Sequence, residues 1–368
     1  MAGIMPAATA TDSPFSDVVS SGARRAELAH NARVAPFRSY DSMKNLACRL
    51  LCAFVAAIAV AAAPAQTMER IVFATDWFAQ AEHGGFYQAL AEGTYRKYGL
   101  DVTIRMGGPQ VNGLQLLAAG QLDVAMADAL QVLSAVEQRV PVVAIAATFQ
   151  KNPTVIIAHP GVTKIEELKG TPIAVSAASN TTFWPWLKER YGFTDDQKRP
   201  YAFSVQPFLV DPKLSQQGFA TSEPFSIEKG GVRPVVFLLA ELGYPPYSEV
   251  LAVTRKTASA RADALQRFVR ASAEGWKSYL ANPAPGNALI RRENPQMSDE
   301  LLAYGHRKMV EYAIVTGTDS ATGGLLTMTE ARWRQTIDFL RAAGLAKPNV
   351  DYASAFTLSI VRDVRVLP

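Results

Sequence analysis

The chain has 368 residues, of which 49% are hydrophobic and 19% are charged, as expected of a globular protein long enough for two domains. Its formal net charge is +4, but residues 1–65 hold six basic and four acidic residues, so the remainder carries only +2. A body this close to neutrality lacks the clustered Lys and Arg of nucleic-acid-binding proteins, which excludes nucleic acid as a partner.

The first 65 residues have the pattern of a targeting region. Residues 1–42 show no periodicity, and we interpret them as a disordered leader or as a start assigned too early. Residues 43–65 begin with a basic residue and end in Ala63-Pro64-Ala65, as a signal peptide does. Their apolar stretch, residues 50–63, is shorter than the roughly 20 residues that a membrane-spanning helix needs. We therefore expect a mature protein that begins near Gln66 and is exported to the periplasm.

From Glu69 onwards, short apolar runs alternate with segments of helical periodicity. Strands separated by helices in this way form a parallel sheet that is covered on both faces, and two such sets predict two α/β lobes. The first set has strands at 70–75, 101–104 and 123–126 and helices at 84–98 and 110–119. The second set has strands at 171–175, 203–205 and 218–220 and helices at 181–190 and 212–217.

The apolar runs 142–147 and 250–254 flank the second set and are predicted to be central strands. The simplest topology takes the chain out of the first lobe near 148–154 and back near 244–249, which is a double-crossover hinge. The remaining signals are helical, at 260–280, 298–316 and 329–343. We assign residues 69–148 plus 249–345 to lobe 1 with its helical C-terminal segment, 154–244 to lobe 2, and 346–368 to a tail.

Ligands of open parallel sheets bind beyond the carboxyl ends of the strands, so the residues that follow each predicted strand are candidates. Asp76 and Trp77 directly follow the first strand, and the indole can stack on a flat ligand. His83 and Gly84 lie where the first helix begins, with free N–H groups and space for close approach. The candidate ligand-binding residues are Asp76, Trp77, His83, Gly84, Tyr87, Asp128, Asn180, Thr181 and Glu223.

Several of these candidates also have a purely structural interpretation. An aromatic residue such as Tyr87 or Phe183 fits a hydrophobic core as well as a ligand wall. The segment from His83 to Gly85 is equally a glycine-softened helix start with a surface histidine. Residues 179–182 are fully explained as the N-cap of a helix in the second lobe.

The charged residues in these loops are mostly acidic. They are Asp76, Glu82, Asp128 and Glu223, with Lys151 as the single cation. An anionic ligand such as nitrate, sulfonate or phosphate would require Arg side chains or several donors. The predicted cleft therefore suits a neutral or cationic ligand with N–H groups, for which Asp76 or Glu223 is the acceptor.

Sequence motifs of catalysis are missing. None of the four histidines has the spacing of a metal site, and neither a G-x-S-x-G elbow nor a Walker motif is present. Both cysteines, Cys48 and Cys52, precede residue 66, so the mature chain has no thiol. We expect no catalytic residue, no metal and no cofactor.

A family resemblance rests on five segments of the first lobe. In these segments the chain resembles the periplasmic-binding-protein family of thiamine-pyrimidine precursor binders, which also includes the binding proteins of sulfonate- and nitrate-type importers and the fungal-type thiamine pyrimidine synthases. The resemblance covers about residues 69–290 and implies a periplasmic-binding-protein-like fold. The segments are Thr75-Asp76-Trp77, residues 83–87, Ala91-Glu92-Gly93, residues 98–102 and residues 117–123.

The resemblance implies a solute-binding subunit of an ABC importer. Such a protein captures a small nutrient in the cleft between its lobes and delivers it to permease subunits in the inner membrane, and we expect it to be monomeric. In pyrimidine-binding members, the Asp and Trp after the first strand hold and stack the ring, and these roles fall here on Asp76 and Trp77. The expected ligand is a pyrimidine-like or amine-bearing nutrient.

The synthase members of the family provide an enzymatic alternative. They carry a cofactor-bearing Lys and, four residues on, a sacrificed His just after the third strand, together with a Cys-rich segment in the second lobe. Here Ala127 and Gln131 stand at those two positions, and no Cys follows residue 65. These departures disfavour thiamine pyrimidine synthesis. A sensory two-lobe domain is a third interpretation, which would need a fused transmembrane or signalling segment.

Overall fold

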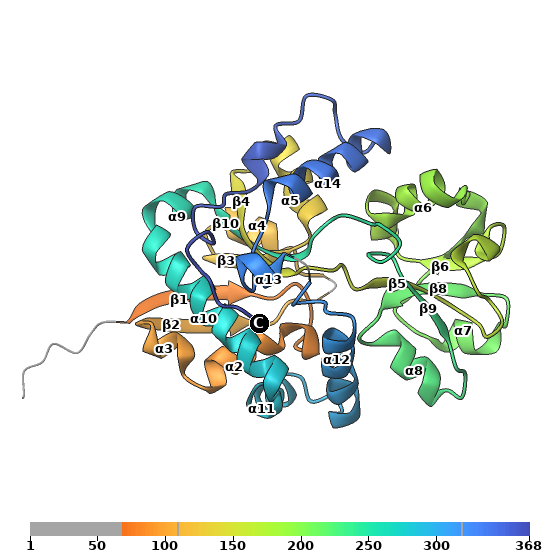
Figure 1. Ribbon diagram of the computed structural model, residues 1–368, viewed down its shortest axis with the longest axis horizontal. Helices are drawn as coiled ribbons and strands as arrows, with labels where there is room; N and C mark the ends of the chain where they lie inside the picture. The colour runs from red at the N-terminus through yellow and green to blue at the C-terminus, as the bar shows by residue number, and fades with distance from the viewer. Residues whose placement is uncertain (1–67, 109, 318) are drawn as a thin grey trace, which may run out of the picture. The chain divides into compact units, whose positions relative to one another are not determined.

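The computed structural model describes residues 68–368, except residues 109 and 318 (Figure 1). The predicted leader and signal peptide and both cysteines lie outside this part of the chain. Among the helices that the structure describes, none is both long and apolar enough to cross a membrane.

The described chain builds two five-stranded sheets, each with its own helices (Figure 1). We call each sheet with its helices a lobe. The sheet of lobe 1 has the order β2-β1-β3-β10-β4 and is made of β1 (Glu69–Ala74), β2 (Leu100–Arg105), β3 (Val124–Ala127), β4 (Val142–Phe149) and β10 (Ser248–Thr254). The sheet of lobe 2 has the order β7-β6-β8-β5-β9 and is made of β5 (Thr154–Ala158), β6 (Ile173–Val175), β7 (Lys198–Pro200), β8 (Ser215–Phe219) and β9 (Val235–Leu238).

The helices follow the same division. Lobe 2 contains η3 (Ala177–Thr181), α6 (Phe183–Tyr191), α7 (Gln206–Val210) and α8 (Glu223–Lys229). Lobe 1 begins with η1 (Ala81–His83), α2 (Gly84–Ala91), α3 (Thr94–Lys97), α4 (Gly113–Ala118) and α5 (Ala129–Glu137). After the return of the chain come α9 (Arg255–Ala260), α10 (Ala262–Ala281), α11 (Ala284–Glu293), α12 (Asp299–Glu311), α13 (Ser320–Gly323) and α14 (Glu330–Ala342). The predicted fold of two α/β lobes joined by a double crossover, with a helical C-terminal segment, is confirmed.

The expectation of purely parallel sheets is wrong. Strand β10 runs antiparallel to both of its neighbours, β3 and β4, and β5 runs antiparallel to β8 and β9. The reason is topological: β4 carries the chain out of lobe 1, and β10 brings it back alongside β4 in the opposite direction. Both sheets are therefore mixed.

Two elements predicted for lobe 2 are also wrong. The expected strand at 203–205 is a turn in which Phe203 has a φ of 55°, and the expected helix at 212–217 is replaced by a turn and the start of β8. The helix expected at 212–217 overlaps strand β8, whose interior is polar. Gln217 satisfies its side chain by accepting from the Ser176 N–H at 2.6 Å, so the sequence shows no apolar run there.

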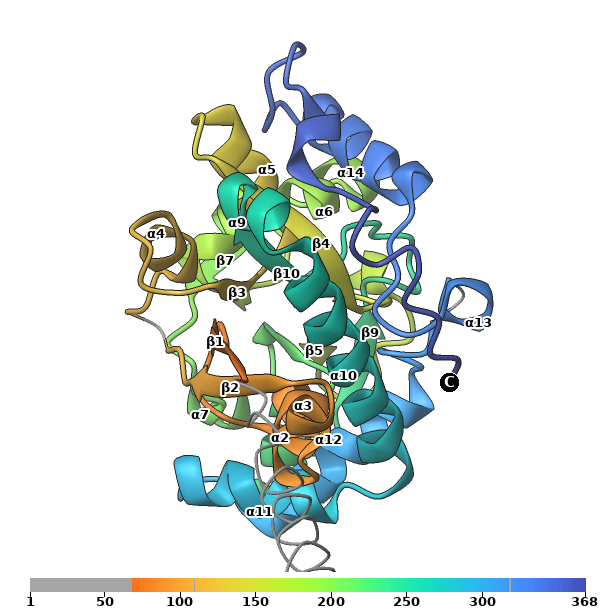
Figure 2. The ribbon, with the colours of Figure 1, turned by 90° about the vertical axis from the view of Figure 1, so that its left-hand side faces the viewer.

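Lobe 1 depends on close contact between α10 and α2, which lie side by side in Figure 2. Glycines permit this approach. A Cβ on Gly275 of α10 would lie 2.3 Å from the Gly85 carbonyl oxygen, and one on Gly85 would lie 2.2 Å from the Trp276 ring. The contact fixes the start of α2, whose N-cap residue is His83.

The two crossovers, residues 150–153 and 239–247, are joined by a side chain from α14. Arg332 donates from Nε to the Pro245 carbonyl at 2.8 Å and from Nη1 to the Gln150 carbonyl, so it binds one crossover with each edge of its guanidinium. The same group lies 4.1 Å from the centroid of the Tyr247 ring. Helix α14 thus ties together the two segments that connect the lobes.

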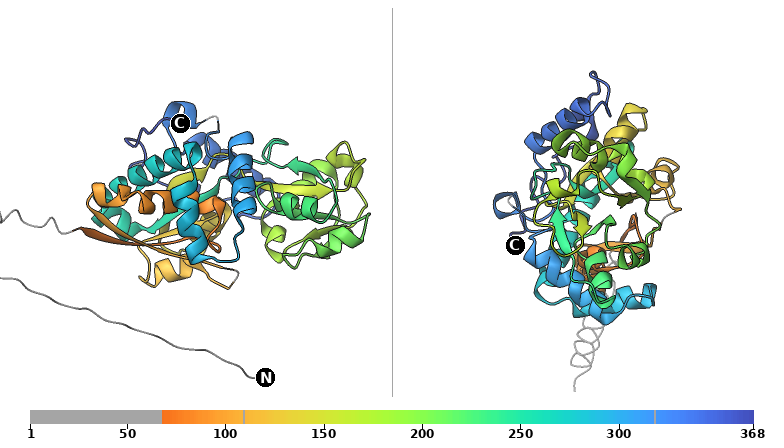
Figure 3. Two further views of the ribbon diagram at one scale, coloured as in Figure 1. Left: turned by 90° about the horizontal axis from the view of Figure 1, so that it is seen from below. Right: turned by 90° about the vertical axis from the view of Figure 1, so that its right-hand side faces the viewer.

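Helix α12 contacts both lobes, and it lies between them in Figures 1 and 3. Gly305 is at the centre of this contact, because a Cβ there would lie 2.8 Å from the Ala81 Cβ in lobe 1 and 3.2 Å from the Thr221 carbonyl in lobe 2. Lys229 on α8 reaches Glu300 on α12 at 3.2 Å. Residues that follow β1 and β8 are thereby held close to each other.

Residues 346–368, assigned as a tail, pack on lobe 1. Phe356 stacks on Trp333 of α14 with the ring centroids 5.2 Å apart. It also forms an isolated parallel bridge with Ala144 of β4. These contacts fix the position of α14 relative to the sheet.

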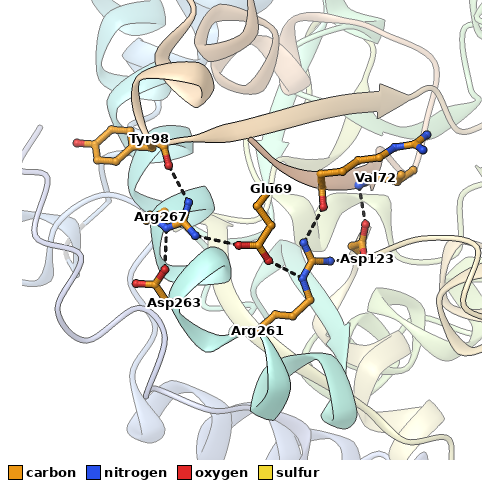
Figure 4. A network of polar contacts seen from close by, with 8 residues as sticks. Glu69, Val72, Tyr98, Asp123, Arg261, Asp263 and Arg267 are labelled. Carbon is orange, nitrogen blue, oxygen red and sulfur yellow. Dashed lines mark hydrogen bonds and ion pairs between the residues drawn. The ribbon is translucent and has the colours of Figure 1, made fainter. Parts of the chain in front are cut away.

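An ion-pair network closes the end of the lobe 1 sheet where β1 begins (Figure 4). Arg261 donates to Glu69 at 2.9 Å, to Asp123 at 2.6 Å and to the Arg70 carbonyl at 2.6 Å. Arg267 reaches the second oxygen of Glu69 at 2.9 Å. Because the network joins the start of α10 to the starts of β1 and β3, it serves the fold and lies at the opposite end of β1 from Asp76.

We predict that Arg261→Ala lowers the free energy of unfolding by about 1–2 kcal/mol, since it removes three contacts from a partly buried network. Urea denaturation at neutral pH measures this loss. The control is Arg291→Ala, which removes one exposed pair with Asp299 at 2.9 Å and should change stability by less than about 0.5 kcal/mol. Equal losses in the two variants would contradict a cooperative network.

Candidate functional site

Three carboxyl groups gather at one edge of the lobe 1 sheet. Asp76 follows β1, Asp128 follows β3, and Glu249 is the second residue of β10. The register pairs Val250 with Ala127, so the antiparallel β10 begins where β1 and β3 end and sets Glu249 opposite Asp128. This edge is where ligands of α/β sheets bind.

Asp76 is held by a buried histidine. The His83 Nε2 lies 3.1 Å from the Asp76 Oδ1, and the side chain of His83 is 1% exposed whereas that of Asp76 is 36% exposed. His83 is therefore not the surface histidine of the alternative interpretation. It lies beneath Asp76 and fixes the carboxylate at the edge of the sheet.

Asp128 and Glu249 lie deeper at the same edge. The Asp128 Oδ1 accepts from the Leu130 N–H at 2.7 Å and caps α5, while Gln131 returns the bond to the Asp128 N–H. Burial raises the pKa of Asp128 to about 7, and the negative charge of Asp76 adds to the rise. Burial also raises the pKa of Glu249 well above its ordinary value, and the negative charges of Asp76 and Asp128 raise it further.

Apart from the imidazole of His83, these carboxyl groups have no basic partner among the residues that the structure describes. In residues 68–368 without 109 and 318, neither Lys nor Arg forms an ion pair with Asp76, Asp128 or Glu249. Lys151, the single cation expected in the cleft, pairs instead with Glu241 of the other crossover at 3.3 Å. The acidic character predicted for this region is stronger in the structure than in the sequence, because Glu249 adds to it.

Aromatic rings from both lobes meet beside the carboxyl groups. Trp77 of lobe 1 packs against Phe203 of lobe 2, with the ring centroids 5.4 Å apart. Phe203 is 59% exposed and has a left-handed backbone, so the fold presents a large apolar ring in a strained turn. Its neighbour Tyr201 lies 5.3 Å away. Flat ligands are recognised by stacking on such rings.

Lobe 2 has a cavity of about 300 Å³ next to these rings, near the lower limit for small-molecule sites. Glu223 is fixed in its wall, because it accepts from the Phe219 N–H at 2.7 Å and from the Tyr201 hydroxyl at 3.0 Å. Thr221, two residues earlier, donates to Glu82 of lobe 1. The cavity is lined by Tyr201, Phe203, Ser204, Val205, Ser222, Glu223 and Ser226.

The other sequence candidates lie elsewhere or serve the packing. A Cβ on Gly84 would lie 2.1 Å from the Tyr279 ring, so this glycine admits a core tyrosine. Tyr87 is 2% exposed and belongs to the core. Asn180 and Thr181 are exposed in η3 and donate to carbonyls of their own turn, at Ala177 and Ala178.

The N-cap interpretation of residues 179–182 is confirmed for the position of Thr182, the N-cap residue of α6, but not for a side-chain capping bond. Helix α6 begins after Thr182, which makes no side-chain capping hydrogen bond, and residues 177–181 form the separate turn η3. Asn180 instead accepts from Lys198 at 2.7 Å. This segment therefore has a local bonding pattern of its own.

Comparison with known proteins agrees with this architecture. A family model described as "NMT1/THI5 like" matches residues 80–285. The riboflavin-binding protein RibY of Chloroflexus aurantiacus is 25% identical over 323 residues, which cover 83% of this chain and 91% of that protein.

Two solved structures show the same fold at low sequence identity. The periplasmic aliphatic sulphonate binding protein SsuA of Escherichia coli has a TM-score of 0.62 at 14% identity, covering 78% of this chain and 91% of that chain. The desulfurization enzyme DSZB has a TM-score of 0.53 at 13% identity, covering 80% and 98%. The fold therefore occurs in binding proteins and in an enzyme, and the choice between them depends on the residues of the site.

Proposed function

Since the chain belongs to the NMT1/THI5-like family, we propose that it is the solute-binding subunit of an ABC importer and that its ligand is a flat nitrogen heterocycle with N–H groups. The ligand lies against Trp77 and Phe203 and donates to the carboxyl groups at the edge of the lobe 1 sheet. In this proposal the protein works as a monomer in the periplasm and delivers its ligand to permease subunits in the inner membrane.

The observation that carries the proposal is a set of three carboxyl groups that have neither Lys nor Arg as an ion-pair partner in the described part of the chain. Asp76, Asp128 and Glu249 share one edge of the sheet, and a buried negative charge is costly unless hydrogen-bond donors or a cation accompany it. A ligand with N–H groups supplies those donors. An anionic sulfonate or nitrate would add to the repulsion, so the site does not favour the ligand class of the sulphonate-binding protein.

The size of the lobe 2 cavity supports a small ring. RibY is named for binding riboflavin, whose tricyclic ring system is also flat and rich in nitrogen. The cavity of about 300 Å³ beside Phe203 is at the small end of the range for ligand sites. Its lining contains Phe203 but none of the three carboxyl groups, so it accommodates only the side of the ligand that faces lobe 2, and we propose a one-ring heterocycle such as an aminopyrimidine.

The enzymatic alternative finds no support in the residues at its expected positions. Ala127 is 2% exposed within β3 and has no amine that could bind a cofactor. Gln131 is occupied as the reciprocal partner of Asp128 in the cap of α5. A binding protein is therefore the function that we propose.

A ligand panel tests this proposal by thermal shift and then by calorimetry. We expect 4-amino-2-methylpyrimidine to bind and raise the unfolding temperature, and methanesulfonate to have no effect at the same concentration. Riboflavin is included because of the resemblance to RibY. A preference for riboflavin over the pyrimidine would mean that the ligand is a tricyclic and not a one-ring heterocycle. Binding of methanesulfonate alone would contradict the proposed ligand class.

A further inference from the structure

Glu249 occupies an unusual position for a glutamate. Its φ is 58°, in the left-handed region that favours glycine or asparagine and costs other residues about 1 kcal/mol. Its side chain is 4% exposed, and its Oε2 has no hydrogen-bond partner among the residues that the structure describes. Backbone strain and an unsatisfied buried carboxyl both oppose stability, which is the combination expected of a functional residue.

The charges that act most strongly on Glu249 are those of other acids. Asp76 from the loop after β1 lies within hydrogen-bonding reach, Asp128 comes from the cap of α5, and Glu82 comes from η1. His83 stands behind Asp76 and bonds to it. Tyr244 of the second crossover also lies nearby, and burial, followed by the negative charge of Asp128, raises the pKa of its hydroxyl.

Two neighbouring carboxyl groups can share a hydrogen bond only when one of them holds a proton. Asp76 is the better anion, because it is more exposed and bonded to His83. Glu249 is nearly fully buried and lies beside other acids, which favours its protonated form over that of Asp76. The pair then presents one acid and one carboxylate side by side.

We propose that Glu249 is a ligand-binding residue and that the Glu249–Asp76 pair recognises the amidine edge of a basic heterocycle, a ring nitrogen next to an exocyclic amine. This inference rests on the proposed function and specifies its ligand. Glu249 gives its proton to the ring nitrogen, and Asp76 accepts from the exocyclic N–H. One O–H bond breaks and one N–H bond forms, so the ligand is bound as a cation between two carboxylates without an added reactant.

The ultraviolet spectrum of 4-amino-2-methylpyrimidine distinguishes its protonated form from its neutral form. At a pH above the ligand's own pKa, we expect the pyrimidine bound to the wild-type protein to show the protonated spectrum. Bound to Glu249→Gln, it should show the neutral spectrum, with affinity lower by about tenfold or more, since a charged hydrogen bond is lost. A neutral spectrum on the wild-type protein overturns the inference while the proposed function stands.

The pH dependence of binding provides a second readout. As the pH falls through the ligand's pKa, the wild-type affinity should fall, because a ligand that is already protonated must displace the proton of Glu249. In Glu249→Gln the affinity should instead rise over the same range, because ligand that has been protonated by the solvent binds the Asp76 carboxylate more strongly than the neutral ligand does. The same sign of the slope in both proteins would overturn the proton transfer.

Infrared spectroscopy locates the proton in the free protein. The wild-type protein at neutral pH should show a protonated-carboxyl C=O band that disappears when the pyrimidine is added and is missing in Glu249→Gln. The matched control is Glu82→Gln, because Glu82 is also buried but already accepts from Thr221. In this control the ligand-sensitive band should remain. Its loss would show that the proton lies on Glu82 and not on Glu249.

A second substitution separates function from folding. Glu249→Gly removes the buried carboxyl and suits the left-handed backbone, so it should be at least as stable as the wild-type protein in urea. At a pH above the ligand's own pKa, the pyrimidine bound to this variant should still show the neutral spectrum. A marked loss of stability in Glu249→Gly would assign Glu249 to the fold and overturn its role as a ligand-binding residue.

Discussion

Gly275→Ala is expected to destabilise the protein by about 2 kcal/mol or more, although alanine is the better helix former by roughly 1 kcal/mol. The added Cβ would lie 2.3 Å from the Gly85 carbonyl oxygen and 2.6 Å from the Ala89 Cβ. Both obstacles belong to the facing helix α2 and cannot rotate away as a flexible side chain would. Because Gly85 lies under the Trp276 ring, α2 also has no room to shift. Urea denaturation followed by circular dichroism measures the loss.

The control for this prediction is Gly113→Ala. Gly113 is also helical, but a Cβ there would be 3.5 Å from its nearest neighbour, the Ala125 Cβ, which is ordinary van der Waals contact. We expect this variant to be as stable as the wild-type protein or slightly more stable. If Gly275→Ala behaves like Gly113→Ala, the close approach of α10 to α2 is wrong.

Trp77→Ala and Asp76→Asn are each expected to weaken the binding of 4-amino-2-methylpyrimidine by about tenfold or more. Trp77 supplies the stacking surface, and Asp76 supplies the charge that accepts the exocyclic N–H. Neither change should disturb the fold, because both side chains are partly exposed and Asn can still accept from His83. Isothermal calorimetry gives the two affinities, and urea denaturation verifies the fold.

Phe78→Ala is the matched control for the tryptophan. Phe78 is adjacent in sequence, 42% exposed and in edge contact with Trp77 at 5.7 Å, so its removal changes a similar apolar surface without removing the proposed stacking ring. We expect a smaller loss of affinity than in Trp77→Ala. An equal loss in the two variants, or no loss in Asp76→Asn and Trp77→Ala, would move the ligand away from this edge of the sheet.

The sequence was sufficient to predict the two lobes because their signals are local. The apolar runs at 142–147 and 250–254 have the composition of buried strands, and they flank a second strand-and-helix set, which indicates an excursion and a return. Strand β8 has no such signal, because the side chains of Gln216 and Gln217 bond to backbone groups once the sheet has formed. A polar strand leaves no hydrophobic period to detect.

The site was predictable only where a residue follows a parallel strand. Asp76 and Asp128 do so, whereas Glu249 lies at the start of an antiparallel strand, and a rule that considers only the carboxyl ends of strands does not include it. Phe203 was not a candidate, because residues 203–205 were expected to form a strand. Lys151 pairs with Glu241, which lies 90 positions further along the chain, and no local sequence pattern indicates this pair.

The antiparallel pairing at the crossovers makes lobe 2 a continuous segment inserted into the sequence of lobe 1. Strands β4 and β10 are neighbours in one sheet and β5 and β9 are neighbours in the other, so the segment 154–238 leaves and re-enters its host at adjacent points. Such a segment can be exchanged as a cassette between related genes. The recipient would keep the acidic edge with Asp76, Asp128 and Glu249, while the donor would bring a new ring and cavity wall in place of Phe203 and Glu223. Recombination of this kind would change the aromatic ring and the cavity wall of lobe 2 without changing the carboxyl groups of lobe 1.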